Sequence, residues 1–123
     1  MIAEHQLSLL NIALDHLSLA RAGDPSHFTP AIDGLRRAGA LEFLPLGLLA
    51  RGTQHDLDEV YKIATRSGMR LHLTDYHLKQ AALDLVTGNQ TKAREHTQIA
   101  ADLIQATGYH RRDPDLALLR QQL

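Results

Sequence analysis

The sequence predicts an all-α protein made of stacked antiparallel helical hairpins, an α-solenoid, and three observations support this fold class. Leucine and alanine, both strong helix formers, are abundant, whereas aromatic residues make up only 4% of the chain. Apolar residues recur at helical spacing, and no alternating strand pattern is present. A turn glycine followed by two small or apolar residues occurs twice at the same spacing, as Gly52-Leu57-Ala64 and as Gly88-Ala93-Ala100. Such recurrence is typical of a hairpin that is used more than once.

The N-terminal region predicts two helices separated by a turn. The first covers about residues 2–21, because leucines at positions 7, 10, 14 and 17 share one face. Gly23 and Pro25 end it, since glycine closes helix C-termini and proline cannot continue a helix. The second covers about residues 29–38, with Thr29 as its N-cap and Pro30 in the first turn, where a missing N–H costs nothing.

Two interpretations are open for residues 44–66. In the first, a short helix over 44–51 is separated by Gly52 from a helix over 54–66, which Thr53 and Asp56 begin as a capping box. The middle hairpin is then truncated. In the second, residues 44–66 form one continuous helix that cannot fold back on itself and exchanges its second half with another copy, giving a symmetric dimer. The apolar residues expected to mediate that self-association are Leu48, Leu49, Leu57, Val60 and Tyr61.

The C-terminal region predicts three further helices, over residues 70–87, 90–107 and 113–122. Gly88-Asn89 and Gly108 mark the turns between them, and Asp113 is expected to cap the last helix ahead of Pro114. The buried stripe of the helix over 70–87 is expected to contain Leu71, Leu78, Ala81, Ala82 and Leu85. All helices are assigned to a single domain over residues 1–123.

Composition argues against several classes of function. The net charge of −1 is unlike that of a nucleic-acid-binding protein. The absence of cysteine excludes disulfides and thiolate chemistry and favours a cytoplasmic location. No apolar run is long enough to span a membrane, so no membrane partner is expected. None of the eight histidines has another histidine three or four residues away, so we expect no metal. No serine or threonine has a recognisable nucleophile context, and we expect no cofactor and no enzymatic activity.

The densest polar cluster contains Tyr109, His110, Arg111 and Arg112. Such a cluster can bind a phosphate or a carboxylate, because arginine offers several donors in a fixed geometry. The alternative is a structural loop in which Tyr109 packs after the preceding helix. We favour the structural loop.

The hairpin around Gly88 resembles the tetratricopeptide repeat, which requires small residues where Ala81, Ala93 and Ala100 stand. The chain departs from that family where large apolar residues are usual, because it has His77, Gln80 and Asp84 there, and Thr97 replaces an aromatic residue. Segments such as Gly68–Leu73 and Gly108–Asp113 are also similar to the helical-repeat ends of large bacterial signalling and NTPase proteins. These resemblances imply a module that binds other proteins.

The leading hypothesis is therefore a non-enzymatic protein–protein interaction or regulatory scaffold module with an unidentified protein partner. Its groove is expected to be lined by Asp75, Leu78, Ala82 and Leu85. The second hypothesis is a self-assembling homodimeric structural protein. The third is a small-ligand binder or an enzyme that uses the histidines and the Tyr109 cluster.

Overall fold

The computed structural model describes residues 4–123, with side chains from residue 7 onward, and this part of the chain is all-helical, as predicted. It contains seven α-helices and two 3-10 helices, η1 and η2, and no strand occurs among these residues. The predicted helix start at residue 2 lies outside the described residues. The chain divides into two compact units, Met1–Arg51 and Gly52–Leu123, called here the N-terminal and C-terminal units and described separately.

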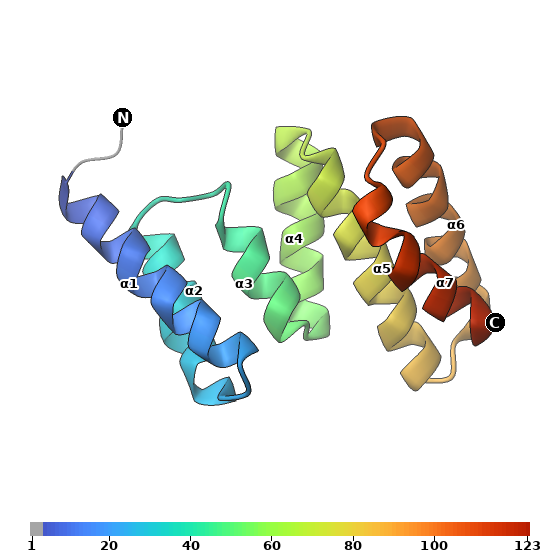
Figure 1. Cartoon of the computed structure of the whole chain (residues 1–123), viewed down its shortest axis with the longest axis horizontal. Coiled ribbons are helices and arrows are strands. Elements are labelled where there is room, and N and C mark those ends of the chain that lie inside the picture. The colour runs from blue at the N-terminus through green and yellow to red at the C-terminus, as the bar shows by residue number, and fades with distance from the viewer. Residues whose placement is uncertain (1–3) are drawn as a thin grey trace. The chain divides into compact units, whose positions relative to one another are not determined.

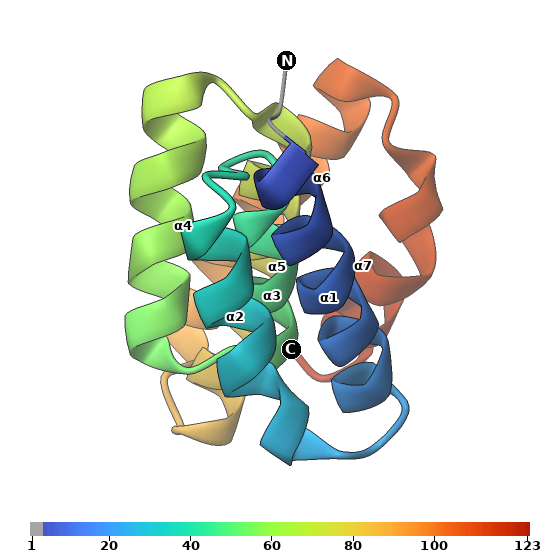
Figure 2. The ribbon, with the colours of Figure 1, turned by 90° about the vertical axis from the view of Figure 1, so that its left-hand side faces the viewer.

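The N-terminal unit is a helical hairpin followed by a short helix. α1 (Glu4–Arg21) and α2 (Phe28–Arg37) lie side by side in opposite directions, and η1 (Pro25–His27) connects them (Figures 1 and 2). The expectation that Thr29 caps α2 is wrong. The helix begins one residue earlier, because η1 leads directly into it and places His27 at the N-cap in a helical conformation.

Two glycines allow the helices of this unit to approach closely. A Cβ atom added at Gly34 of α2 would lie 2.8 Å from the Cβ atom of Ala13 in α1. A Cβ atom added at Gly47 of α3 (Leu44–Arg51) would lie 3.0 Å from a side-chain carbon of Ile32 in α2. Glycine therefore occurs inside these helices because a larger residue would separate them.

The interpretation of residues 44–66 as one continuous helix is wrong. Gly52 has a left-handed backbone with φ of 69°, which interrupts the helical path and which glycine adopts without strain. Thr53 then begins α4 (Gln54–Ser67) with the predicted capping box: its hydroxyl oxygen accepts from the Asp56 N–H, and the Asp56 carboxylate accepts from the Thr53 N–H. Gly52 therefore ends α3, and the Thr53 cap begins α4.

This break also affects the burial of the residues expected to mediate self-association. Leu48, Leu49, Leu57 and Val60 are buried, whereas Tyr61 is 45% exposed. Four of the five residues expected to mediate self-association are therefore already buried within their own chain. The break allows α3 to lie against α2 and α4 to lie against α5, and each short helix turns its apolar side inward.

The C-terminal unit consists of α4 and three further helices joined by short turns. α5 (Arg70–Val86) and α6 (Gln90–Thr107) form an antiparallel hairpin, and α7 (Asp113–Gln121) follows η2 (His110–Arg112) and packs against both (Figure 1). Asp113 is the first residue of α7 rather than its cap, because η2 leads straight into the helix. The hydrophobic core shared by α5, α6 and α7 contains Leu78, Ala81, Ala100, Ala101, Ile104, Leu116 and Leu119, with Leu85 packed against it.

Candidate functional site

The candidate site lies on α5, whose face toward α4 and α6 carries three buried polar side chains. His77, Gln80 and Asp84 are 8%, 5% and 7% exposed. Their spacing of three and four residues places them on one side of the helix. These are the positions that the sequence marked as departures from an apolar pattern. Polar groups at such positions must find partners, because an unpaired buried polar group is costly.

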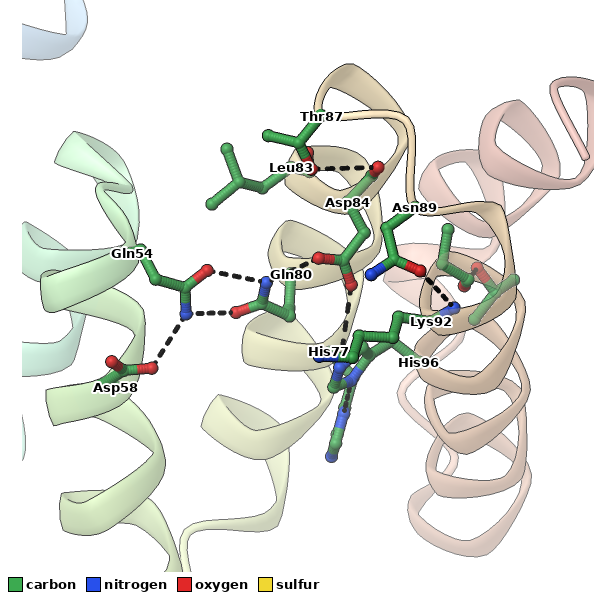
Figure 3. Close-up of polar contacts among 12 residues, drawn as sticks. Gln54, Asp58, His77, Gln80, Leu83, Asp84, Thr87, Asn89, Lys92 and His96 are labelled. Carbon is green, nitrogen blue, oxygen red and sulfur yellow. Dashed lines mark hydrogen bonds and ion pairs between the residues drawn. The ribbon is translucent and has the colours of Figure 1, made fainter.

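Two glutamine amides connect α4 to α5 (Figure 3). The Gln54 amide nitrogen donates to the Gln80 carbonyl oxygen over 2.8 Å, and the Gln80 amide nitrogen donates back over 2.9 Å. The second hydrogen of each amide is also used: Gln54 donates to Asp58 over 2.8 Å, and Gln80 donates to one Asp84 oxygen over 3.1 Å. Both amides therefore donate twice, which fixes their orientation.

Two histidines connect α5 to α6. The Nδ1 atoms of His77 and His96 are 2.8 Å apart, and their ring centroids are separated by 5.1 Å. At this distance one imidazole donates and the other accepts, so at least one Nδ1 atom must be unprotonated. The other ring nitrogen of His96 lies 3.8 Å from Oδ2 of Asp84. This Oδ2 atom is buried and has no hydrogen-bond partner in the structure.

Tyrosine rings enclose the histidine pair. Tyr76 lies edge-on to His77 with ring centroids 4.8 Å apart, and it is also 5.9 Å from His96. Tyr61 of α4 packs on Tyr76 at 5.1 Å. His77 is therefore buried, whereas His96 is half-buried.

The enclosure shifts the pKa values of the site. Burial, together with the neighbouring His96, lowers the pKa of His77 from 6.5 to about 4. Burial also lowers the pKa of His96, although Asp84 and Glu95 oppose this by favouring its charged form. Burial raises the pKa of Tyr76, and the nearby Asp58 carboxylate acts in the same direction. Both histidines are therefore predominantly neutral at pH 7.

The polar cluster predicted around Tyr109 is bound to α5. The Arg112 guanidinium donates to Asp75 over 2.7 and 3.4 Å, and the Tyr109 hydroxyl donates to the same carboxylate over 3.2 Å. Burial opposes the charge on Arg112, but the contact with Asp75 raises its pKa overall. His110 lies 3.1 Å from Asp113, and Arg111 is exposed. This arrangement attaches η2 to α5.

The residues predicted to line a groove do not share an open surface. Leu78 is buried in the core with Leu116 and Leu119 of α7, and Leu85 packs against the same core. Ala82 is exposed, and Asp75 is bonded to Arg112 and Tyr109. Leu71, also expected in the buried stripe, is exposed. α7 covers the side of α5 that contains Leu78 and Leu85.

Histidines form a second pair in the N-terminal unit. The Nδ1 atoms of His16 in α1 and His27 in η1 are 2.8 Å apart, and Asp24 lies 3.4 Å from the other nitrogen of His27. Sequence reasoning missed both pairs, because it searched only for neighbours within one helix. Among residues 7–123, no group of three or more histidine and acidic side chains is arranged to hold a metal ion.

A shallow cleft of about 280 Å³ lies between α6 and α7. Its lining is mostly polar, and Asp102, His110, Asp113 and Arg120 contribute charged or titratable groups from both helices and η2. The lining therefore carries both signs of charge.

Comparisons with known proteins leave the site to be interpreted from its own geometry. No protein-family model, no curated protein and no solved structure matches this chain. In the part of the chain that the structure describes, no helix has the length and apolar character needed to cross a bilayer. The arrangement of side chains must therefore support any proposed function.

Proposed function

We propose that the chain is a non-enzymatic, tetratricopeptide-like helical module that works in the cytoplasm by binding a helix of another protein through the outer face of α1. The observation that supports this is an apolar stripe on α1, where Ile12 is 55% exposed and Leu19 is 50% exposed. These residues are seven apart, so they lie two turns apart on the same face. Isolated exposed apolar residues are common, but two in line on one helix suit recognition of a partner helix.

The opposite face of α1 already has a partner, which explains why the stripe is available. Leu10, Ala13 and Leu17 are buried, and the close contact between Ala13 and Gly34 seats α1 on α2. α1 therefore has two apolar faces, of which one packs within its hairpin. An amphipathic helix from a partner would cover the other, as neighbouring hairpins cover each other in helical-repeat proteins.

A peptide selection tests this proposal. A library of helical peptides is randomised at the positions of one face. It is selected separately on the wild-type chain, on a double variant of the α1 stripe and on a matched control variant. We expect the wild type to enrich peptides with large apolar residues at i, i+3 or i+4, and i+7. Burial of one such side chain is worth about 1.5–3 kcal/mol, so the double variant Ile12→Glu, Leu19→Glu should bind selected peptides at least about tenfold more weakly.

The matched control is Val86→Glu, Leu118→Glu, which places two charges at exposed apolar positions of the C-terminal unit. It should bind the selected peptides like the wild type, and circular dichroism should show equal helix content in all three proteins. Equal binding by both double variants, or enrichment of no apolar pattern, contradicts the proposal.

Light scattering identifies the competing function of self-assembly. If the wild type is a dimer and the Ile12→Glu, Leu19→Glu variant is a monomer, the occupant of the stripe is a second copy of the chain. The homodimer hypothesis would then replace binding of a different protein. A monomeric wild type that binds selected peptides supports the proposal as stated.

A further inference from the structure

We infer that His77, His96 and Asp84 form a proton-operated junction in the C-terminal unit: the chain of contacts accommodates one added proton, and a second proton separates α5 from α6. The geometry that supports this is a chain of three groups. The two Nδ1 atoms face each other at 2.8 Å, and Nε2 of His96 faces Oδ2 of Asp84 at 3.8 Å (Figure 3). The junction is separate from the α1 stripe, so the two proposals fail independently.

The Asp84 carboxylate determines which imidazole donates at neutral pH. Its Oδ2 atom can only accept, so the proton of neutral His96 belongs on Nε2, which faces it. Nδ1 of His96 then carries a lone pair. His77 must therefore be protonated on Nδ1 and donate to His96, and the Nε2 atom of His77 is left unprotonated.

The first added proton is accommodated without breaking this chain. It binds Nε2 of His77, and the shared proton moves from Nδ1 of His77 to Nδ1 of His96. His96 is then a cation that donates to His77 through Nδ1 and places its Nε2–H opposite the Asp84 carboxylate, 3.8 Å away. This supplies a charged partner for an Asp84 oxygen that otherwise lacks one.

The second added proton cannot be accommodated. It must bind Nδ1 of His77, so two N–H groups on two cations would face each other at the 2.8 Å separation of the Nδ1 atoms. No lone pair remains between the rings, and like charges repel. Because His77 belongs to α5 and His96 to α6, the rings can part only if these helices move or their side chains leave the site.

The buried Oδ2 atom of Asp84 can be reached by a proton but not by a larger ligand. The Oδ2 atom of Asp84 has almost no accessible surface, so a ligand or hydrated ion cannot reach it without opening the fold.

The polar and titratable groups that face the junction come from all three packed helices: Gln54, Asp58 and Tyr61 from α4, Tyr76, Gln80 and Asp84 from α5, and Lys92 and Glu95 from α6. Burial disfavours the first proton on His96 and lowers the pKa of this group overall, although Asp84 and Glu95 favour the proton and Lys92 opposes it.

The pH dependence has a definite sign. The unfolded chain protonates His77 near its ordinary pKa of 6.5, but the folded chain does so only at about 4. Between these values the unfolded state binds more protons, so folding weakens as the pH falls. The contribution of His77 is fully present above pH 6.5 and can reduce the folding equilibrium constant by up to about tenfold per pH unit down to pH 4.

Imidazole NMR of the full chain provides the test. The Cε1–H signals of His77 and His96, assigned with single His→Gln variants, are followed from pH 8 to pH 3. We expect two coupled steps that both histidines report, the second near pH 4. Amide exchange in α5 and α6 should accelerate across the second step. Independent titration of both rings near 6.5, or a second step without faster exchange, overturns the inference.

Unfolding experiments separate the junction from the general effect of acid on carboxylates. The variant His77→Gln, His96→Gln keeps a donor and an acceptor but cannot titrate, much like the Gln54–Gln80 pair. Its stability should change less than that of the wild type between pH 6.5 and 4. His55→Gln, which replaces an exposed histidine of α4, is the matched control and should keep the wild-type slope. Equal slopes in wild type and double variant overturn the inference, and if the double variant does not fold, the NMR titration of wild type decides.

Discussion

At the scale of single residues, the contact between Gly34 and Ala13 sets the distance between α1 and α2. The space for an added Cβ atom is already occupied by the Ala13 Cβ atom, 2.8 Å away, and the Ala13 Cα atom lies 3.4 Å away. Neither atom belongs to a flexible side-chain end. A larger residue at Gly34 must therefore move a whole helix.

Gly34→Ala tests this contact, because the two physical effects of the change have opposite signs. Alanine favours a helix over glycine by about 1 kcal/mol, whereas overpacking costs about 1–3 kcal/mol. We expect lower stability in urea denaturation. The compensating double variant Ala13→Gly, Gly34→Ala should recover part of the loss, because it removes the methyl group that clashes. A Gly34→Ala variant more stable than the wild type would show that the helices have room to spare.

At the scale of helices, the Thr53 cap decides that α3 and α4 are two elements. Thr53→Ala removes the oxygen that accepts from the Asp56 N–H, and the expected loss of stability is about 0.5–2 kcal/mol. Thr65→Ala, at an exposed position inside α4, is the control and should leave stability nearly unchanged. Equal midpoints of thermal unfolding for the two variants would contradict the role of the cap.

The attachment of η2 to α5 gives a second prediction at this scale. Asp75→Asn removes the charge that holds Arg112 and weakens the acceptor of the Tyr109 hydroxyl. We expect faster amide exchange in η2 and α7 but unchanged exchange in α4, because the contact is local. Asp113→Asn changes an exposed carboxylate beside His110 and should have a smaller effect. The opposite order of the two variants would assign the attachment to His110 instead.

At the scale of the whole chain, features that depend on neighbouring residues could be predicted from the sequence. The turn at Gly52-Thr53 and those at Gly88-Asn89 and Gly108 separate helices in the structure, because caps and left-handed glycines act within one turn of helix. The start of α2 was mispredicted for a related reason. The η1 turn that displaces it is stabilised by Asp24, which accepts from the Ser26 N–H.

The candidate site could not be predicted in the same way, because its partners are distant in sequence. His77 and His96 are separated by 19 residues, and Asp75 and Arg112 by 37. No helical periodicity relates them, and only the packing of α5 against α6 and η2 brings them together. The available signal was the polarity of His77, Gln80 and Asp84 on a face expected to be apolar, which shows that partners exist but not which they are.

The doubly donating amides of Gln54 and Gln80 restrict how this sequence can evolve. Replacing either glutamine alone would leave the other amide, and an oxygen of Asp84 or Asp58, without its hydrogen bond. A paired change at both positions would avoid that penalty only if residue 80 still donated to Asp84. Substitutions at 54 and 80 should therefore be inherited together in descendants of this chain, and a lineage that drifts at one position should be under selection to change the other.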